Sequence, residues 1–363
     1  MLTTSALLSR HPSAPFALET VEIDGPRADE ILVRIEAVGI CHTDLVTRAA
    51  GATDRPVLLG HEGCGTVEAV GAAVDSVRPG ERVVLTFRQC GDCGNCRTGR
   101  PAYCRKSVRL NNFGSRSDRT PRITAAGAPV LDGFFGQSSF AGYALTTADN
   151  TVVVDPATDP VLAAPLGCGF QTGAGAVHNA LRPGADDTLV VFGAGPVGLA
   201  GLLAAIALGV SSTVVVEPNP ARRALALDLG ASAALDPAAG DTVAALRDHT
   251  CGGASHCLDT TGSPAVLADA VAALAIGGTV VAVGLGAGTP AIDVRDIVLG
   301  GKTIRGCLEG DATPHTFIPH LLDLHAAGRF PMDRLITPYP HTDIESALAD
   351  QHRGTTVKPV LTW

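Results

Sequence analysis

Four cysteines stand close together in one Gly-rich segment, at Cys90, Cys93, Cys96 and Cys104. Their spacing is C-x2-C-x2-C-x7-C, and four thiolates in so short a loop can surround one tetrahedral ion. An iron–sulfur cluster also uses four cysteines, but the sequence lacks the C-x2-C-x2-C-x3-C-P spacing of ferredoxins. A disulfide is the other alternative, and it is unfavourable in a cytoplasmic chain. The loop therefore predicts a closed, structural zinc site.

A catalytic zinc site needs three protein ligands and one open position for water or substrate. The candidates are dispersed along the chain: Cys41 in GICHTD, His61 in GHEG and Cys168 in GCG. Taken singly, a cysteine among small residues is most often a small buried hydrophobe, and a single histidine is most often a surface or core residue. The bare residues leave this second site open.

A phosphate-binding turn is predicted at GAGPVG, which follows the apolar run 189–192 and precedes a helix-like segment, 199–208. In this pattern the first glycine permits a tight turn and the second lets the backbone approach a pyrophosphate. The third lets helix and strand pack closely. The candidate cofactor contacts are Gly193, Gly195, Pro196, Val197 and Gly198.

An acid follows this turn at the end of the next apolar run, at Glu217. A carboxylate there accepts hydrogen bonds from ribose hydroxyls and repels a 2′-phosphate, so NAD is predicted over NADP. Two cations nearby, Arg222 and Arg223, keep NADP open as an alternative. Arg222 is a candidate cofactor contact, although a solvated helix face explains at least one of the pair.

Length and charge limit the other possibilities. A chain of 363 residues exceeds the size at which one core stops growing, so two domains are expected. The net charge is −9 and the basic residues form no long run, which argues against nucleic acid or an anionic membrane as partner. No apolar run reaches the roughly 18 residues of a membrane span, and residues 1–16 do not resemble a signal peptide. We expect a cytoplasmic protein that acts on a small molecule.

The elements that must hold these residues fall into two kinds. Residues 31–39 and 65–85 alternate β-branched and polar residues, which predicts short antiparallel strands. Residues 107–136 are polar and Gly-containing, which predicts a long connecting loop. Beyond residue 170, short apolar runs alternate with Ala/Leu-rich segments, which predicts an α/β, doubly wound parallel sheet. Helix patterns at 317–327 and 344–350 precede a last strand at 357–361.

Taken together, GICHTD, GHEG, the four-cysteine loop, GCG, GAGPVG and the carboxy-terminal VKPV resemble the zinc-containing medium-chain alcohol dehydrogenases, in that family's order along the whole chain. The segments FFGQSSF at 134–140 and GFQTGAGAV at 169–177 resemble, more narrowly, the bacterial aryl-alcohol (benzyl alcohol) dehydrogenases. The same holds for Glu309-Gly310-Asp311 with Phe317-Ile318-Pro319 and Gly328-Arg329-Phe330-Pro331.

The resemblance implies a mainly-β, GroES-like catalytic domain (1–169 and 309–363) and a Rossmann NAD-binding domain (170–308). It implies that Cys41, His61 and Cys168 bind the catalytic zinc and that the four-cysteine loop binds the structural zinc. Glu62 would be a transient ligand behind the catalytic zinc, and Asp44 would orient a zinc-bound histidine. His42 and Lys358 would contact the cofactor pyrophosphate.

The chemistry so implied is hydride transfer between a primary alcohol or its aldehyde and NAD, with zinc lowering the pKa of the alcohol. Thr43 would accept the alcohol proton, but Val46 occupies the position where the family often carries the histidine that completes the relay. We expect Thr86, Leu285 and Leu308 to line the substrate pocket, with Phe113 or Phe140 as further walls. Such small and apolar groups suit a flat aromatic or allylic alcohol.

Two other functions compete with this interpretation. One is a thiol-adduct formaldehyde dehydrogenase of the same fold, although the loop 47–56 lacks an evident acidic pair for glutathione. The other is a catalytically silent relative that only binds cofactor, which the intact Cys41, His61 and Cys168 oppose. A homo-oligomer, dimer or tetramer, is also expected.

Overall fold

The computed structural model describes residues 1–50, 55–113, 116, 118 and 120–363. The chain divides into two compact units. The first consists of Met1–Cys168, Thr313–Leu322 and Ile336–Trp363, and the second of Gly169–Ala312 and Asp323–Leu335. The predicted domain boundaries at 169/170 and 308/309 stay a prediction, and the return of 323–335 to the second unit has no counterpart in them.

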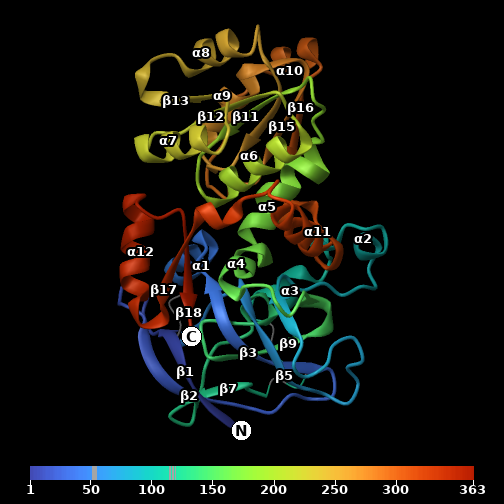
Figure 1. The fold of residues 1–363 in the computed structure, drawn as a ribbon, viewed down its shortest axis with the longest axis vertical. Coiled ribbons are helices and arrows are strands. Elements are labelled where there is room, and N and C mark those ends of the chain that lie inside the picture. Colours follow the sequence, from blue (N-terminus) through green and yellow to red (C-terminus); the bar gives the residue numbers. More distant parts are fainter. Residues whose placement is uncertain (51–54, 114–115, 117, 119) are drawn as a thin grey trace. The chain divides into compact units, whose positions relative to one another are not determined.

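The smaller sheet of the first unit is five-stranded, in the order β4-β1-β2-β7-β8 (Figure 1). Its strands pair antiparallel, with Leu7 opposite Leu18 and Ile23 opposite Ile123. The bounds are β1 Leu2–Ser9, β2 Ala17–Ile23, β4 Val57–Leu58, β7 Ile123–Ala125 and β8 Ala128–Pro129.

The larger sheet of this unit has the order β10-β6-β5-β3-β18-β17, and β9 also pairs with β3. β3 is its central strand, because it pairs antiparallel with β5, β9 and β18 along its length. The bounds are β3 Glu30–Gly39, β5 Gly63–Val70, β6 Arg82–Leu85, β9 Tyr143–Thr147, β10 Thr151–Val153, β17 Ile336–Pro340 and β18 Lys358–Thr362.

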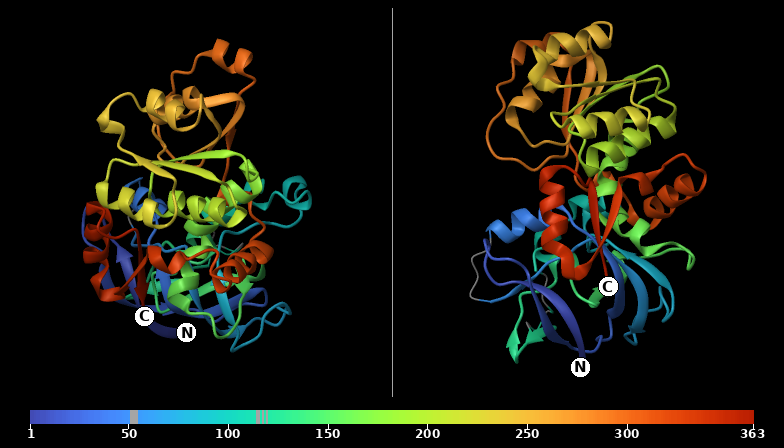
Figure 2. Two further views of the ribbon diagram at one scale, coloured as in Figure 1. Left: turned by 45° about the horizontal axis from the view of Figure 1, so that its top comes forward. Right: turned by 60° about the vertical axis from the view of Figure 1, so that its left-hand side comes forward.

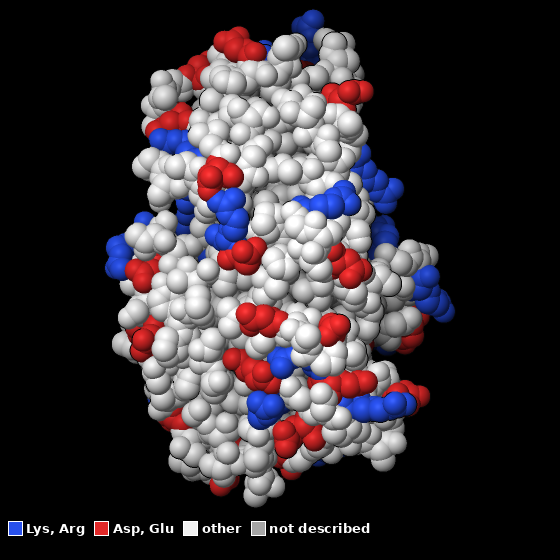
Figure 3. Space-filling model, viewed as in Figure 1, with Lys and Arg blue, Asp and Glu red and all other residues white. Residues whose placement is uncertain are grey.

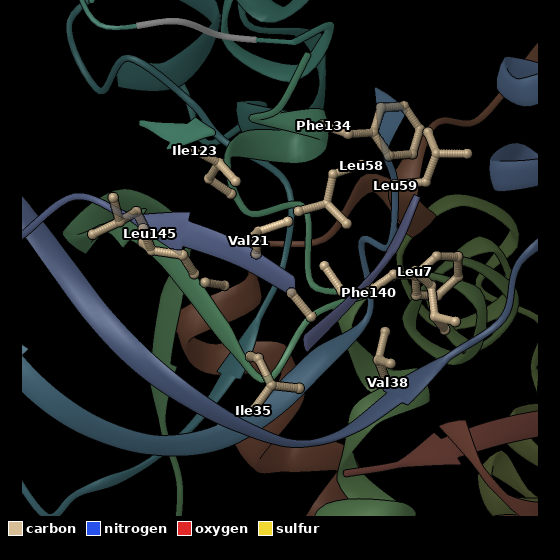
Figure 4. Close-up of a cluster of buried hydrophobic side chains, with 14 of the residues drawn as sticks. Leu7, Val21, Ile35, Val38, Leu58, Leu59, Ile123, Phe134, Phe140 and Leu145 are labelled. Carbon is tan, nitrogen blue, oxygen red and sulfur yellow. The ribbon is translucent and has the colours of Figure 1, made fainter. Parts of the chain in front are cut away.

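The core of the first unit lies between these two sheets (Figure 4). Leu7 and Val21 enter it from β1 and β2, and Ile35 and Val38 enter it from β3. Because side chains alternate across a strand, each sheet gives one apolar face to this core. The predicted strands at 31–39 and 65–85 are confirmed as β3 and as β5 with β6.

Short helices surround these sheets. Their bounds are α1 His42–Ala50, α2 Gly94–Arg97, α3 Ser107–Asn111, α4 Pro160–Ala163 and α12 Ile344–Arg353, while α11 Pro314–Ala326 begins in the first unit and ends in the second. Single helical turns of this unit occur at Pro101–Tyr103, Phe134–Gly136, Ala148–Asn150, Ala164–Gly167 and His341–Asp343. Those of the second unit occur at Pro237–Ala239, Glu309–Asp311 and Met332–Leu335.

The prediction of a long loop over 107–136 was wrong in part. The segment contains α3, the β7–β8 hairpin and the helical turn at Phe134–Gly136. The hairpin turns at Ala126 and Gly127, both with positive φ. Each strand has only two or three residues, too few for a visible alternation of apolar and polar residues.

The second unit is built on a six-stranded parallel sheet in the order β13-β12-β11-β14-β15-β16. Its bounds are β11 Thr188–Phe192, β12 Ser212–Val216, β13 Ala233–Leu235, β14 Ala254–Asp259, β15 Leu274–Ala282 and β16 Thr303–Gly306. The strand order reverses between β11 and β14, and dinucleotides bind at such switch points. This confirms the predicted doubly wound α/β sheet.

Helices cover both faces of this sheet (Figures 1 and 2). α6 and α7 lie on one side, and α8, α9 and α10 lie on the other. The bounds are α5 Gly169–Gly175, α6 Pro196–Leu208, α7 Pro220–Asp228, α8 Thr242–His249, α9 Pro264–Ala273 and α10 Val294–Gly300, with a π-helical turn at Ala176–Leu181 after α5. α6 is apolar all round, and most of its residues are buried.

Among the described residues, no helix has the length and apolar character needed to cross a membrane. On the face drawn in Figure 3, acidic and basic side chains are interspersed rather than segregated by sign.

Candidate metal centres and cofactor-binding turn

The four cysteines of the predicted closed site come together around α2: Cys90 and Cys93 precede the helix, Cys96 lies in it and Cys104 follows the next helical turn. The sulfur atoms of Cys90, Cys93, Cys96 and Cys104 all lie within 4.8 Å of one another. The Sγ atoms of Cys93 and Cys96 are 3.4 Å apart, and those of Cys90 and Cys96 are 3.9 Å apart. Four sulfurs at about 2.3 Å from one tetrahedral zinc are about 3.8 Å from each other, so the cluster fits that ion. All four are free thiols, which contradicts the disulfide alternative.

Backbone amides point at two of these four sulfurs. The N–H of Arg105 points at Cys93 Sγ and that of Lys106 at Cys104 Sγ, at 3.5 and 3.4 Å. Hydrogen bonds from the backbone of Arg105 and Cys96 lower the pKa of Cys93 to about 6. A lowered pKa favours the thiolate, which is the form that binds zinc.

The dispersed residues form a second cluster in the same unit. Sγ of Cys41 and Cys168, a ring nitrogen of His61 and a carboxylate oxygen of Glu62 lie within 4.8 Å of one another. Cys41 directly precedes α1, His61 and Glu62 directly precede β5, and Cys168 ends the helical turn at Ala164–Gly167. The structure thus brings together the candidates that the sequence left dispersed.

Asp44 links two of the ligand segments. Its Oδ2 accepts a hydrogen bond from the N–H of Cys41, and its Oδ1 accepts one from the N–H of Gly60, both at 3.0 Å. Oδ1 also lies 3.0 Å from Nδ1 of His61, and both side chains are fully buried. With Nδ1–H directed to the carboxylate, Nε2 carries the lone pair that a metal requires.

The atoms of this second cluster fit a zinc ion. In the part of the chain that the structure describes, His61 Nε2 is buried and has no hydrogen-bond partner. A hydrogen bond with Cys168 lowers the pKa of the Cys41 thiol well below its usual range, in spite of burial. Two cysteine sulfurs and one imidazole are the ligand set of a catalytic zinc in some dehydrogenases, with the fourth position open.

Glu62, a member of this cluster, also forms a buried ion pair. Its Oε2 is 2.5 Å from Nζ of Lys358, and the same ammonium donates to the carbonyl of Ile40 at 3.0 Å. Burial raises the pKa of Glu62 to about 7, although the charge of Lys358 opposes the rise. Lys358 is thus engaged within the first unit, and its implied contact with a pyrophosphate stays a prediction.

The residues of the implied proton relay lie on α1. Thr43 Oγ1 is 3.7 Å from Sγ of Cys41, so the hydroxyl adjoins the metal cluster. Val46 stands one helical turn further on with 48% of its surface exposed, and His42 is also exposed. The roles of Thr43 and His42 stay predictions.

Two aromatic rings, which the sequence did not assign to the site, pack against His61. The Phe135 ring stacks on the imidazole, with centroids 4.5 Å apart, and Phe134 contacts it edge-on at 5.2 Å. Phe113 packs against Phe134 at 5.6 Å. Phe140, which we expected as a wall, packs against Phe16 in the core instead (Figure 4). The motif FFGQSSF contained this signal, but it did not indicate which ring faces the histidine.

The predicted substrate-pocket residues are placed as follows. Thr86 is fully buried, and its hydroxyl donates to the carbonyl of Gly167 at 2.7 Å, next to Cys168. Leu285 and Leu308 belong to the second unit and are exposed. Their role in a pocket stays a prediction. Part of the loop 47–56, where no acidic pair was evident, lies outside the described residues.

The glycine-rich turn joins β11 to α6 in the second unit. A Cβ on Gly198 would stand 1.9 Å from the carbonyl oxygen of Gly193, so helix and strand approach too closely for a side chain. A Cβ on Gly195 would meet nothing within 4 Å, so the backbone there is open to a ligand. Pro196 and Val197 begin α6, whose N-terminus favours an anion.

Glu217 is held against this turn. Its Oε2 accepts from the N–H of Ala194 at 2.7 Å, and its Oε1 accepts from that of Asn219 at 2.8 Å. Arg223 donates to the carbonyl of Glu217 and pairs with Asp236 at 3.0 Å, which supports a structural role for it. Arg222 follows the cap residue Asn219 in the first turn of α7.

The first unit carries two candidate metal clusters, and the second carries a glycine turn on a parallel sheet. Together these features define a zinc-binding dehydrogenase. A family model described as "Alcohol dehydrogenase GroES-like domain" matches residues 27–156, and one described as "Zinc-binding dehydrogenase" matches residues 196–327. The chain belongs to the zinc-dependent alcohol dehydrogenase family. Zinc is the metal of this family, and NAD is its typical cofactor.

The chain is similar to a geraniol dehydrogenase from Castellaniella defragrans, with 49% identity over all of this chain and 98% of the relative. A crystal structure of an alcohol dehydrogenase zinc-binding domain protein from Burkholderia ambifaria matches with a TM-score of 0.97 and 44% identity, over 99% of both chains. The benzyl alcohol dehydrogenase of Acinetobacter calcoaceticus matches with a TM-score of 0.95 and 40% identity, over 100% of this chain and 99% of that one.

Proposed function

We propose that the protein oxidises primary alcohols bearing an aromatic ring or an allylic double bond, with NAD as the hydride acceptor. The buried cluster of Cys41, His61 and Cys168, covered by the ring of Phe135, carries this proposal. The 49% sequence identity to a geraniol dehydrogenase over the full chain and the structural similarity to a benzyl alcohol dehydrogenase support the substrate class. The first unit would carry the catalytic chemistry and the second would bind the dinucleotide.

When bound, zinc would supply a Lewis acid that lowers the pKa of the alcohol, and NAD would accept the hydride from its carbon. The protein's own residues do the positioning. Asp44 fixes the tautomer and orientation of His61 through Nδ1, while the stacked ring of Phe135 restricts rotation of the imidazole. Phe135 also offers an apolar surface, which favours a flat substrate over water.

The alcohol must also lose its hydroxyl proton. Thr43 lies on α1 next to the cluster and would accept that proton at its hydroxyl oxygen. Val46 has no group that can take the proton further. A water at the exposed end of α1 would complete the transfer to solvent.

A substrate panel tests this proposal. Benzyl alcohol and geraniol should exceed ethanol in kcat/KM by at least a hundredfold. Each buried methylene contributes about 0.8 kcal/mol to binding, and a two-carbon chain lacks most of these groups. S-(hydroxymethyl)glutathione tests the formaldehyde dehydrogenase alternative in the same assay. Equal efficiency with ethanol, or a preference for the glutathione adduct, would contradict the proposal. No turnover with any member would favour the silent relative.

The cofactor preference rests on Glu217. A buried carboxylate beside the glycine turn repels a 2′-phosphate, so NAD should exceed NADP in kcat/KM by tenfold or more. Glu217→Gln should narrow that gap because it removes the charge while keeping the shape. Equal or better kcat/KM of the wild-type protein with NADP would refute this part.

The predicted homo-oligomer and cytoplasmic location belong to the same proposal. β16 is at one end of the parallel sheet. Exposed apolar side chains stand on β16 itself (Ile304), on the adjacent strand β15 (Ile276) and on α10, which precedes β16 along the chain (Val294, Val298 and Leu299). An edge strand with apolar neighbours can pair with its own copy around a twofold axis.

Reduced thiols in both metal clusters suit a cytoplasmic location.

A further inference from the structure

Gln137 is a buried amide whose hydrogen-bonding groups are all engaged. Its Nε2 donates to the carbonyls of His61 and Thr86, at 2.9 and 3.2 Å. Its Oε1 accepts from the N–H of Gly63 and the hydroxyl of Ser139, each at 3.1 Å. A primary amide has two N–H donors and two acceptor positions, and here each is used, with 1% of the residue exposed. Such saturation fixes the amide in one orientation.

The hydrogen-bond partners of this amide lie in the segments that carry the candidate metal ligands. Two of its bonds hold the peptide segment on either side of Glu62, from the carbonyl of His61 to the N–H of Gly63. A third reaches Thr86, whose hydroxyl in turn bonds the carbonyl of Gly167, the residue before Cys168. A Cβ on Gly63 would lie 3.1 Å from Oε1 of Gln137, so a glycine leaves room for the amide.

The loop that carries Gln137 is built for this placement. Phe135 and Ser138, on either side of it, adopt left-handed backbone conformations with φ of 50° and 54°. Residues other than glycine keep such conformations only where the surroundings enforce them. The hydroxyl of Ser138 stabilises this conformation, because its Oγ accepts hydrogen bonds from the N–H of Gly133 and of Phe134 and donates one to the carbonyl of Leu58.

We propose that Gln137 is a positioning residue that sets the backbone of the His61 ligand, as Asp44 sets its ring. This inference rests on the proposed zinc at Cys41, His61 and Cys168. Asp44 restrains His61 at Nδ1, and Gln137 restrains it at the main-chain carbonyl. With both ends held, the direction of the Nε2 lone pair is fixed. Loss of the amide leaves that direction free to vary and weakens the metal site.

The test compares Gln137→Met with Arg116→Gln. Methionine keeps the approximate length and volume but removes all four hydrogen bonds. Arg116→Gln breaks the ion pairs of a buried arginine with Glu30 and Asp24 and removes none of the contacts to His61, Thr86 or Gly63. Three quantities are measured on the full chain: the visible spectrum after cobalt(II) replaces zinc, the rate of metal release to a chelator, and the melting temperature. Cobalt bands that disappear in a Cys168→Ser background belong to this cluster.

We expect Gln137→Met to shift those bands and to speed metal release by tenfold to a hundredfold, the usual effect of losing a group that supports a ligand. It should also lower kcat more than it changes KM. Arg116→Gln should also lower the melting temperature but leave the cobalt bands and release rate unchanged. Gln137→Glu, which keeps the acceptor but loses the donors, should resemble Gln137→Met and replaces it if that variant does not fold.

Unchanged cobalt bands and release rates in the Gln137 variants, with only a lower melting temperature, would overturn the inference and leave the residue a packing element. These readouts do not depend on the substrate. A protein that binds cobalt at Cys168 but oxidises no alcohol refutes the proposed function alone. A protein that binds no metal there refutes both.

Discussion

The carboxylate of Asp44 accepts hydrogen bonds from the main chain of Cys41 and Gly60 and holds the ring of His61. Local spacing could not reveal this arrangement, because nothing in the sequence near GICHTD indicates contact with GHEG. The spacing of Cys90, Cys93, Cys96 and Cys104 did predict a closed cluster, since those residues are neighbours along the chain as well as in space. Cys41, His61 and Cys168 were assigned through resemblance alone, and Gln137 was not assigned at all.

The contrast between the two clusters predicts different losses. Cys168→Ser should abolish activity and remove one zinc per chain while the protein stays folded, because the cluster lies on an existing sheet framework. Cys93→Ser should destabilise the protein by about 2 kcal/mol or more, since a loop without a core of its own depends on its metal. Metal analysis and thermal unfolding measure both, and two zincs retained in Cys168→Ser would contradict the assignment.

The proton pathway predicts a second pair of variants. Thr43→Ala should reduce kcat by roughly a hundredfold, the usual contribution of a positioned proton acceptor. Val46→His places an imidazole with an ordinary pKa of about 6.5 at an exposed position, so a new group should titrate near neutrality in the pH profile of alcohol oxidation. Steady-state rates from pH 6 to 10 decide. An unchanged profile in Val46→His, with near-normal activity in Thr43→Ala, would eliminate the relay.

Some helices and strands were predicted from the sequence, and others, among them β1 and β2, were not. β3, α6, α11 and β18 have enough residues for a visible period. The β7–β8 hairpin and α3 do not, and the turn at Ala126 and Gly127 lacks the Asn-Gly or Asp-Gly pair that marks such hairpins. Tertiary packing decides these elements.

The segment before β7 also contributes a buried cation. Arg116 pairs with Glu30 at the start of β3 at 2.6 Å and with Asp24 after β2 at 2.5 Å. Burial alone would raise the pKa of Glu30, but the hydrogen bonds and charge of Arg116 hold it below its usual value. The hydrogen bond from Arg116 likewise lowers the pKa of Asp24.

Arg116→Gln should therefore reduce the free energy of unfolding at pH 7 by about 3 kcal/mol, since it leaves a buried carboxylate unpaired. A lowered folded-state pKa stabilises the protein above the unfolded pKa near 4, and that stabilisation is lost as the pH falls through the folded value. The difference between wild type and variant should shrink below about pH 4. Arg10→Gln, which breaks an exposed pair with Glu19, is the control and should cost about 1 kcal/mol or less. A difference that stays constant down to pH 2.5 would contradict the assignment.

At the scale of the assembly, the sequence predicted the parallel sheet but not the strands at its two edges. The order β13-β12-β11-β14-β15-β16 leaves β13 and β16 at the ends, and α10, which precedes β16 along the chain, carries the exposed Val298. Ile304→Lys on β16 and Val298→Glu should each shift the protein to monomers, because a charge in an apolar contact must be desolvated. Sedimentation velocity measures the shift. Val108→Glu, at an exposed position of α3, should leave the assembly intact, and oligomers that persist in both test variants would exclude this surface.

The pairing of β18 with β3 bears on how the protein is made. β3 is synthesised early, but its partner at Ala37–Gly39 is the strand Lys358–Thr362, which leaves the ribosome after nearly all of the second unit. The parallel sheet of the second unit can therefore complete its hydrogen bonds during translation. Until β18 is synthesised, the backbone amides on that edge of β3 remain unpaired. Cys41 and Glu62 lie beside that unfinished edge, and Lys358 arrives with β18. The buried ion pair between Lys358 and Glu62, at the candidate metal cluster, therefore forms only after the second unit has been synthesised.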